Sequence, residues 1–370
     1  MKRKYKRLAV NILAIIIYFT ITPSSVTGQA DYLKSIKKID IHTHISDDAV
    51  YLREVMDKLN LKLFTICNKG KEGETERMHY QVNFAKEFCS KYPRYYAWCT
   101  TFDLSCRNEP DWASQVKSFL KDSFSNGAVA VKIWKEIGMQ IKNPAGEFIQ
   151  VDDPIFEPIY DFIEQERKVL FYHIADPVQR WMPSASIKHS PKFADFWNDP
   201  DKPSYFDIIA SGDNMLAKHP NLRFIGCHLG SISFDLDETS KKLDTYPNLA
   251  LGTSGTEKYL IGQSREKVRR FFIKYQDRIL YGTDISGGMI PTDYLLDLKK
   301  LGQKLTPEQA AKRKEFLMKR YINDFRYFGT DEVITKGNHS VSGLALPKEV
   351  LYKIFYGNAV KWVPGINKDY

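Results

Sequence analysis

The chain has 370 residues, and 43% of them are hydrophobic, which is enough to bury a sizeable core in one large domain or two ordinary ones. The formal net charge is +9, but five basic residues lie among the first seven and residues 1–30 contain no acid, so removing that segment leaves 9 − 5 = +4. This mild, dispersed charge, without a basic stripe interleaved with aromatic residues, argues against a nucleic-acid-binding protein.

The N-terminus has the pattern of an export signal. Basic residues precede an apolar stretch from Leu8 to about Ile21, and Gly28 and Ala30 fit the small-residue rule for cleavage. We therefore expect residues 1–30 to be a signal peptide, and the protein to be periplasmic or secreted, with no stable membrane insertion after cleavage. The alternative is a retained anchor helix, although the stretch is shorter than the roughly 20 residues that span a bilayer.

Strand-like and helical segments alternate along the rest of the chain. Runs rich in branched and aromatic residues predict strands over 37–45, 62–67, 95–103, 128–134, 168–174, 222–229, 248–255 and 278–285. Helical spacing of apolar residues predicts helices over 49–59, 74–90, 111–124, 155–166, 204–218, 235–244 and 264–276. Eight such repeats predict an α/β fold of the (β/α)8 barrel type rather than an open doubly wound sheet. No glycine-rich phosphate loop opens any of these helices.

Two segments depart from the repeat. The connection from residue 175 to about 203 is long and rich in Pro, Ser, Trp and Asp, and long loops on the C-terminal face of a barrel usually shape an active site. After the eighth strand we expect a C-terminal extension with a helix over 306–328, a polar loop over 329–345 and a final helix over 347–356. No linker or internal repeat appears, so residues 31–370 are predicted to form one domain.

Ionisable residues stand at the C-terminal ends of five of the predicted strands. The first strand ends in "DIHTH", where alternate side chains share a face, so Asp40, His42 and His44 are expected to project together. Catalytic residues of a barrel come from these strand ends and face one pocket. The residues that occupy these positions are His42, His44, Lys132, His173, His228 and Asp284.

The combined order of "DIHTH", "HLG", "GTD" and the late "YGNA" resembles the amidohydrolase superfamily, within it the amidohydrolase 2 branch. That branch includes aminocarboxymuconate semialdehyde decarboxylase and several lactone hydrolases. The resemblance implies that a catalytic divalent ion is held by His42, His44, His173 and Asp284. Zinc is the first expectation, with manganese, iron and nickel as alternatives. It also implies that His228 either supports the ligands from behind or polarises the substrate. Independently of the resemblance, a carboxylate at Asp284 could hold the attacking water, take its proton and return it to the leaving group.

The sequence allows three roles for Lys132. In some branches of the superfamily the lysine of strand four is carbamylated and bridges two metal ions, so two ions are expected in that case and one otherwise. The lysine could instead stay cationic and bind a substrate, or form a structural ion pair. A buried ammonium beside a divalent cation is repelled by it, which favours carbamylation or a position set back from the ion.

Candidate substrate contacts follow other strands. An arginine beside the site could grip a substrate carboxylate with two hydrogen bonds. The residues considered are Arg77 after strand two, Arg107 after strand three, Arg180 and Trp181 in the long fifth loop, and Ser254 at the end of strand seven.

The leading hypothesis is a metal-dependent hydrolase of an ester, lactone or amide bond in a small polar molecule. The alternative reaction is non-oxidative decarboxylation of a β-keto or phenolic acid, for which the same ion would chelate the substrate. A third reading is a barrel without catalysis that serves as a binding module. The sequence is compatible with a homo-oligomer and leaves the substrate and the metal open.

Overall fold

The computed structural model describes residues 31–45, 48–68, 73–183, 195–197, 199–286, 305–336 and 339–370. The expected signal peptide at residues 1–30 and parts of the long fifth loop lie outside these ranges. Among the helices within them, none has the length and apolar character needed to cross a membrane.

The described strands form the predicted barrel. Successive strands pair in parallel in the order β8-β7-β6-β5-β4-β3-β2-β1-β9, and the two-residue β9 follows β8 and pairs with β1, which brings the last strand back to the first. The strands are β1 Lys38–His44, β2 Leu61–Ile66, β3 Tyr96–Thr100, β4 Ala128–Ile133, β5 Val169–Tyr172, β6 Arg223–Gly226, β7 Leu249–Gly252, β8 Ile279–Leu280 and β9 Ile285–Ser286.

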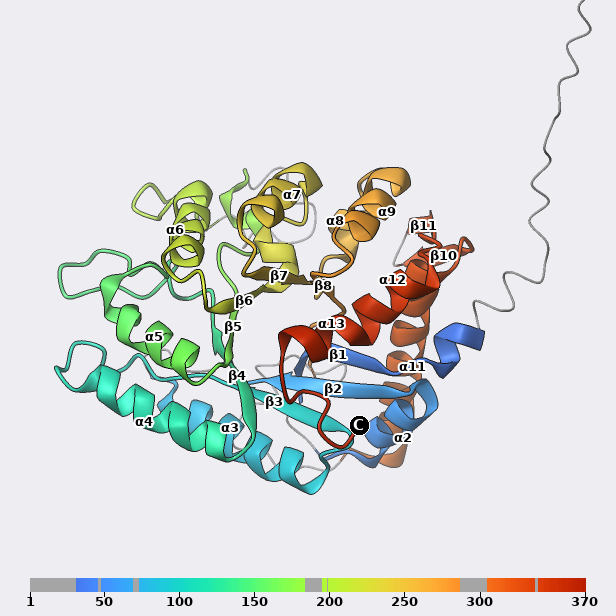
Figure 1. Ribbon diagram of the computed structural model, residues 1–370, viewed down its shortest axis with the longest axis horizontal. Coiled ribbons are helices and arrows are strands. Elements are labelled where there is room, and N and C mark those ends of the chain that lie inside the picture. The colour runs from blue at the N-terminus through green and yellow to red at the C-terminus, as the bar shows by residue number, and fades with distance from the viewer. Residues whose placement is uncertain are drawn as a thin grey trace, which may run out of the picture.

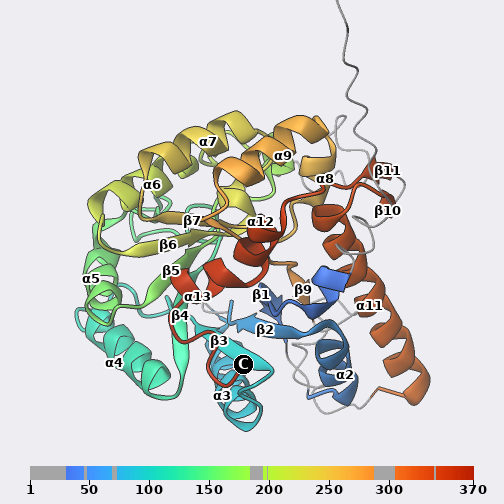
Figure 2. The same cartoon turned by 45° about the vertical axis from the view of Figure 1, so that its right-hand side comes forward.

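Helices surround this sheet, as Figure 1 and Figure 2 show. The main helices are α2 Val50–Leu59, α3 Thr75–Lys91, α4 Trp112–Ser125, α5 Glu157–Gln165, α6 Tyr205–Lys218, α7 Leu236–Thr245, α9 Arg265–Lys274 and α11 Pro307–Gly329. Shorter elements are η1 Pro154–Phe156, η2 Val178–Trp181, η5 Cys227–Ser231 and α8 Glu257–Ile261. The (β/α)8 prediction is therefore confirmed.

The strands read as continuous apolar runs because they are buried on both faces. Every residue of β3 is buried, and one face of the barrel strands contributes to an interior cluster that includes Phe64, Phe171 and Ile225. The other face packs against the helices in a second, larger cluster. Burial on both faces is the expected property of a parallel sheet covered by helices.

The prediction that Asp40, His42 and His44 project together is wrong for Asp40. The pairing of β1 with β2 shifts by one residue between Asp40 and Thr43, which is the signature of a β-bulge. Asp40 therefore contacts Tyr321 of α11, outside the barrel, whereas His42 and His44 line a cavity at the strand ends. A bulge re-aims the side chains that follow it, and the pattern of residues alone does not reveal it.

The C-terminal extension differs from the prediction in two respects. The segment predicted as a polar loop contains an antiparallel hairpin, β10 Val333–Lys336 with β11 His339–Ser342. The final helix is longer than expected and runs as α12 Lys348–Tyr352, the π-helical η6 Lys353–Gly357 and α13 Asn358–Trp362. Its end packs under the barrel, where Trp362, Val363 and Ile366 join the interior cluster.

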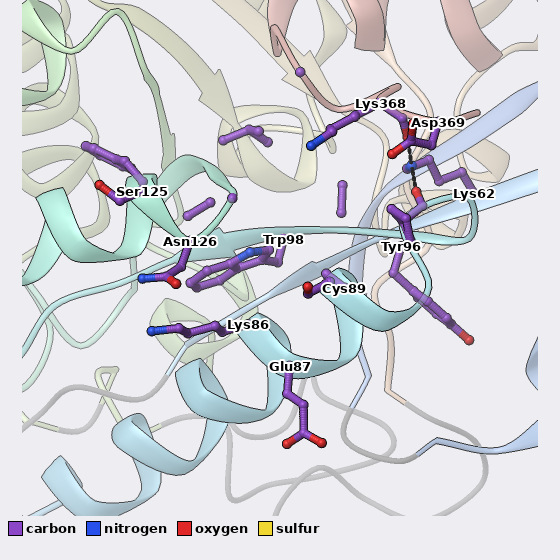
Figure 3. A pocket seen from close by; sticks show the side chains of 18 of the residues that line it. Lys62, Lys86, Glu87, Cys89, Tyr96, Trp98, Ser125, Asn126, Lys368 and Asp369 are labelled. Atoms are coloured by element: carbon purple, nitrogen blue, oxygen red, sulfur yellow. Dashed lines mark hydrogen bonds between the residues drawn. The ribbon is translucent and has the colours of Figure 1, made fainter.

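The N-terminal end of the barrel is closed by the chain's own C-terminus. Figure 3 shows Lys62 beside Lys368 and Asp369, and the Lys62 ammonium donates to the carbonyl of Lys368 at 2.8 Å and to that of Pro93. The Tyr370 hydroxyl donates to the carbonyl of Asn60 at 2.6 Å. A groove of about 710 Å³ remains between this tail and the ends of α3 and α4.

Candidate metal centre

Two histidines and one carboxylate meet at the C-terminal end of the barrel. Nε2 of His42 and Nε2 of His44 both lie 3.3 Å from the same carboxylate oxygen of Asp284. His42 and His44 come from the end of β1, and Asp284 lies between β8 and β9 on the neighbouring side of the closure. The donor atoms of this group lie within 4.8 Å of one another, a spacing that suits ligation of a single ion.

Backbone and hydroxyl partners orient the two imidazoles. Nδ1 of His44 lies 3.0 Å from the carbonyl oxygen of Ile66, which can only accept, so Nδ1 carries the proton and Nε2 presents its lone pair. Nδ1 of His42 lies 2.9 Å from the hydroxyl of Ser254. Partners of this kind on the second ring nitrogen are typical of metal-binding histidines.

A second group adjoins the first and consists of His173, Asp176 and His228. Nε2 of His173 lies 3.2 Å from a carboxylate oxygen of Asp176, and the rings of His173 and His228 are 4.3 Å apart. The donor atoms of this group also lie within 4.8 Å of one another. The His42 and His228 rings are 5.2 Å apart, so the two groups form one continuous cluster.

His228 carries an unsatisfied nitrogen. Its Nδ1 lies 2.7 Å from the carbonyl oxygen of Ser254, which fixes the proton on Nδ1 and leaves a lone pair on Nε2. That Nε2 is buried and has no hydrogen-bond partner within the described part of the chain. A buried polar atom without a partner is costly, so it indicates a position where a ligand or ion completes the site.

The backbone takes an unusual conformation at the residues that build this cluster. Ala175, His228 and Asp284 have φ values of 45°, 55° and 61°, in the left-handed region that residues with a side chain rarely adopt. Ala175 immediately precedes Asp176. Such conformations cost roughly 1–3 kcal/mol each and gather at functional sites, where the surrounding structure enforces them. Ala175, His228 and Asp284 therefore carry local backbone strain at the ends of β5, β6 and β8, next to the cluster.

Charge states in the cluster suit metal ligation. Burial, followed by the charge of Lys132, lowers the pKa of His42 well below its usual range, and burial with the charge of His228 lowers the pKa of His173 to about 3. Burial alone would raise the pKa of Asp284, but the surrounding imidazoles, that of His42 first, hold it well below its usual value. Neutral imidazoles and an ionised carboxylate are the forms that bind divalent ions.

The cluster opens into a cavity of about 240 Å³. Its lining residues are His42, His44, Asn68, Lys132, Trp134, Lys135, Glu136, His173 and Asp284. Asp284 has 37% of its side chain exposed there, so a small molecule can reach it. The larger groove at the opposite end of the barrel has no histidine in its lining. The smaller cavity is therefore the better candidate for chemistry.

Lys132 lies deep in this cavity without an acidic partner in the described residues. Its side chain is 1% exposed, and its Nζ donates to the thiol sulfur of Cys227 at 2.9 Å. The charge of Lys132 lowers the pKa of both His42 and His173, so the amine lies near both donor groups. An ammonium group can donate three hydrogen bonds, so one protein acceptor leaves most of its N–H groups available to a ligand.

The candidate substrate residues lie in different surroundings. Ser254 lies within the cluster, where it holds the rings of His42 and His228. The other four do not line the cavity. Arg180 pairs with Asp195 and the Trp181 indole donates to the carbonyl of Pro203, whereas Arg107 donates to the carbonyls of Leu104 and Lys142, and Arg77 lies 4.0 Å from Glu74.

Three features of the site were absent from the sequence analysis. Asp176 joins His173, and the only signal was its place three residues later in "HIAD". Lys135 and Glu136 line the cavity because the chain turns back over the strand ends after β4. An acid closely following a strand-end histidine could have been noted, but the turn after β4 has no marker that we can identify.

With this geometry in place, the chain can be assigned to a family. Residues 127–365, more than half of the chain, match the sequence model of the family described as Amidohydrolase. The protein therefore belongs to the amidohydrolase family, as the strand-end motifs indicated. Comparison with curated proteins gives no match.

Solved structures with a similar chain path are distant in sequence. They include 5-carboxyvanillate decarboxylase from Sphingomonas paucimobilis, at 13% identity and a TM-score of 0.49 over 89% of this chain and 99% of that one. A probable 2-pyrone-4,6-dicarboxylic acid hydrolase from Acinetobacter baumannii is 11% identical with a TM-score of 0.46 over 89% and 99%. A 4-oxalomesaconate hydratase from Rhodopseudomonas palustris is 11% identical with a TM-score of 0.47 over 90% and 97%.

Proposed function

We propose that the protein is a metal-dependent hydrolase that cleaves an ester, lactone or amide bond in a small polar substrate. The observation that carries the proposal is the cluster of His42, His44, Asp284, His173 and His228 at the mouth of the barrel, with a buried lone pair on His228 that no described residue satisfies. Its donor set suits zinc first and manganese, iron or nickel as alternatives. Membership of the amidohydrolase family supports the same class of reaction.

The residues that would hold the ion are His42, His44, His173 and Asp284. When bound, a divalent ion lowers the pKa of water beside it and polarises the substrate carbonyl. Asp284 has the ionised carboxylate and the exposure needed to take a proton from the attacking water and return it to the leaving group. Nε2 of His42 and Nε2 of His44 each lie 3.3 Å from one oxygen of that carboxylate, so the three donor atoms face one another as ligands of a shared ion would.

The role of His228 depends on whether its ring is neutral or doubly protonated. With Nδ1 donating to Ser254, neutral His228 can only accept at Nε2, so it can hold an ion or take a substrate proton. Donation to a developing oxyanion, the role that the family resemblance implies, requires the doubly protonated ring. If the site holds one ion, we propose that His228 donates a hydrogen bond to the oxyanion. If it holds two ions, we propose that His228 binds one of them.

The number of ions depends on Lys132. We propose one ion when the amine stays unmodified and two when it is carbamylated, because the position of Lys132 near both donor groups suits a bridging ligand. The single N–H···S contact with Cys227 matches the single N–H that a carbamate retains. Intact-mass measurement under native conditions, with and without added bicarbonate, would detect the added carbon dioxide.

We propose that the substrate is an anion. Lys135 lines the cavity and is partly exposed, its charge helps to lower the pKa of Asp176, and no described residue forms an ion pair with it. A carboxylate on the substrate would satisfy that charge and orient the scissile bond. The predicted Arg180, Trp181, Arg77 and Arg107 remain proposals for contacts outside this cavity.

Decarboxylation is the second candidate, and the same cavity lysines favour it. A β-keto or phenolic acid would place its carboxylate toward Lys132 or Lys135 and its oxygen toward the histidines. Asp284, ionised at rest, would first take a proton from the substrate hydroxyl or a water molecule and then deliver it to the carbon that loses carbon dioxide. A screen of lactones, N-acyl compounds and aromatic acids with zinc- or manganese-loaded protein separates the two reactions, because decarboxylation releases carbon dioxide and hydrolysis does not.

The decisive experiment combines elemental analysis with one substitution. The purified protein should hold about one tightly bound divalent ion, or two if Lys132 is carbamylated. Asp284→Asn should lower kcat by about 10²–10⁴-fold while retaining much of the metal, because it loses the proton carrier but keeps an oxygen donor. If the protein holds no ion after reconstitution, the remaining hypothesis is a barrel without catalysis that serves as a binding module. An unchanged kcat in Asp284→Asn would remove Asp284 from proton transfer.

We also propose export to the periplasm or beyond the cell, with cleavage near Ala30. The basic and apolar pattern of residues 1–30 supports it. N-terminal sequencing of the protein from its native host should begin close to residue 31, and an intact Met1 would favour the retained anchor.

A further inference from the structure

Asp40 is a buried carboxylate between the barrel and α11. Its side chain is fully buried and accepts four hydrogen bonds. The backbone N–H groups of His42 and Thr283 each donate to one of its oxygens at 3.1 Å, and the hydroxyl of Thr283 donates to the other. The hydroxyl of Tyr321 donates to that second oxygen at 2.8 Å. The carboxylate therefore connects three segments far apart in the sequence.

Two of these segments carry the candidate ligands. His42 is itself a ligand candidate, and Thr283 directly precedes Asp284, whose own N–H donates to the carbonyl of His42 at 2.8 Å. The contacts with Asp40 thus fix the spacing between the end of β1 and the segment between β8 and β9. His42 and Asp284 face each other across that spacing, with Nε2 and the carboxylate oxygen 3.3 Å apart.

The third segment is outside the barrel. Tyr321 lies in the middle of α11, and its ring is 1% exposed and packs against Phe325 with the ring centroids 6.0 Å apart. Figure 2 shows α11 beside α2, on the outer side of the barrel. Asp40 faces this helix because Ile39 and Ile41 on either side of it point into the barrel, and the bulge that follows turns His42 and His44 toward the cavity.

We infer that Tyr321 is a positioning residue for the metal centre, acting through Asp40 on the backbone of His42 and Thr283. The inference rests on the proposed function, because it assigns a role toward the same ion. Without the Tyr321 hydroxyl, Asp40 would lose one of its four donors, and the carboxylate could shift toward or away from the two ligand-bearing segments. Residues that orient ligands in this way typically change metal affinity by about 10–100-fold when substituted.

The chain contains a matched control. The hydroxyl of Tyr281 donates to the carboxylate of Asp324 at 3.0 Å, again between a barrel strand and α11. Both tyrosines are 1% exposed, and both carboxylates are almost fully buried. Asp324, unlike Asp40, accepts no hydrogen bond from His42 or Thr283 among the described contacts. Tyr281→Phe and Tyr321→Phe each remove one oxygen atom from an equivalent layer, so neither is expected to prevent folding.

The test measures zinc affinity of the full chain by competition with a chromophoric chelator, and thermal stability by circular dichroism. We expect Tyr321→Phe to raise the zinc Kd by about tenfold or more and Tyr281→Phe to change it less than twofold. The two variants should show a similar fall in Tm.

Two outcomes overturn the inference and differ from each other. Equal zinc Kd values for the two variants would show that Tyr321 contributes to stability only, while the proposed metal site stands. A wild-type protein that binds no zinc, manganese, iron or nickel would overturn the proposed function and the role of Tyr321 with it.

Discussion

The two ends of the barrel both bury charged side chains, but they satisfy them differently. At the N-terminal end, Lys38 donates to the carbonyls of Ile36 and Leu59, both at 2.9 Å, and Lys62 donates to those of Pro93 and Lys368. At the C-terminal end, His228 has a nitrogen without a described partner, and Lys132 has only a thiol.

This difference distinguishes buried charged groups that stabilise the fold from buried groups that are available for chemistry. Buried groups whose hydrogen bonds are completed by the protein's own backbone need nothing further, and their role is to close the fold. Buried groups whose donors or lone pairs remain open are stable only if a ligand, an ion or a modification completes them. The two ends therefore differ in how completely they satisfy their buried ionisable groups, although the Trp98 indole N–H at the opposite end also lacks a partner among the described residues.

The largest expected effects are at the C-terminal end. His42→Ala removes a ligand with a fixed orientation, so the Kd for zinc should rise by about 100-fold or more. Elemental analysis after dialysis and chelator competition measure the change. If His42→Ala retains wild-type affinity, the first donor group is not the metal site and the comparison of the two ends fails.

His228→Ala sharpens the comparison within the active end. If His228 stabilises an oxyanion, kcat should fall by about 10²–10³-fold while metal content stays within twofold. Metal loss equal to that of His42→Ala would instead assign His228 as a ligand and favour two ions. Steady-state kinetics and elemental analysis on the same preparation distinguish these results.

Substitution at the opposite end should affect stability alone. Lys62→Met leaves the partly buried carbonyls of Pro93 and Lys368 without their charged donor, which should lower the free energy of unfolding by about 1–3 kcal/mol. Urea unfolding gives the loss, and zinc affinity should not change. A fall in zinc affinity would show that the two ends are coupled.

The smallest expected effect is a pH dependence from the same lysine. Burial lowers the pKa of Lys62 to about 8, against about 10.4 in the unfolded chain. The unfolded state then binds more protons between these values, so the stability contribution is full above about pH 10.4 and is lost as the pH falls toward 8. The stability of wild type relative to Lys62→Met should rise by roughly 1–2 kcal/mol from pH 8 to pH 9.5. A flat difference would mean that Lys62 keeps its ordinary pKa.

Much of the fold could be predicted because apolar runs and turn residues repeat eight times at barrel spacing. The same repeat placed His42, His173, His228 and Asp284 at strand ends, and the structure brings them into one cluster. The β1 bulge could not be predicted, since it depends on the pairing with β2 rather than on local residues. The β10–β11 hairpin was missed although Val333, Ile334 and Thr335 are β-branched residues typical of a strand, because the surrounding segment is rich in polar residues and glycine.

An ion held by His42 and Asp284 would have a mechanical consequence for the barrel closure. His42 lies in β1 and Asp284 lies between β8 and β9, on either side of the seam where β9 meets β1 through two residue pairs. An ion bound by both would link residues that are 284 − 42 = 242 positions apart. A link that closes a longer loop removes more conformational entropy from the unfolded chain, so the expected stabilisation is larger. Removing the ion should therefore speed amide hydrogen exchange along this seam before it affects the strands on the opposite wall.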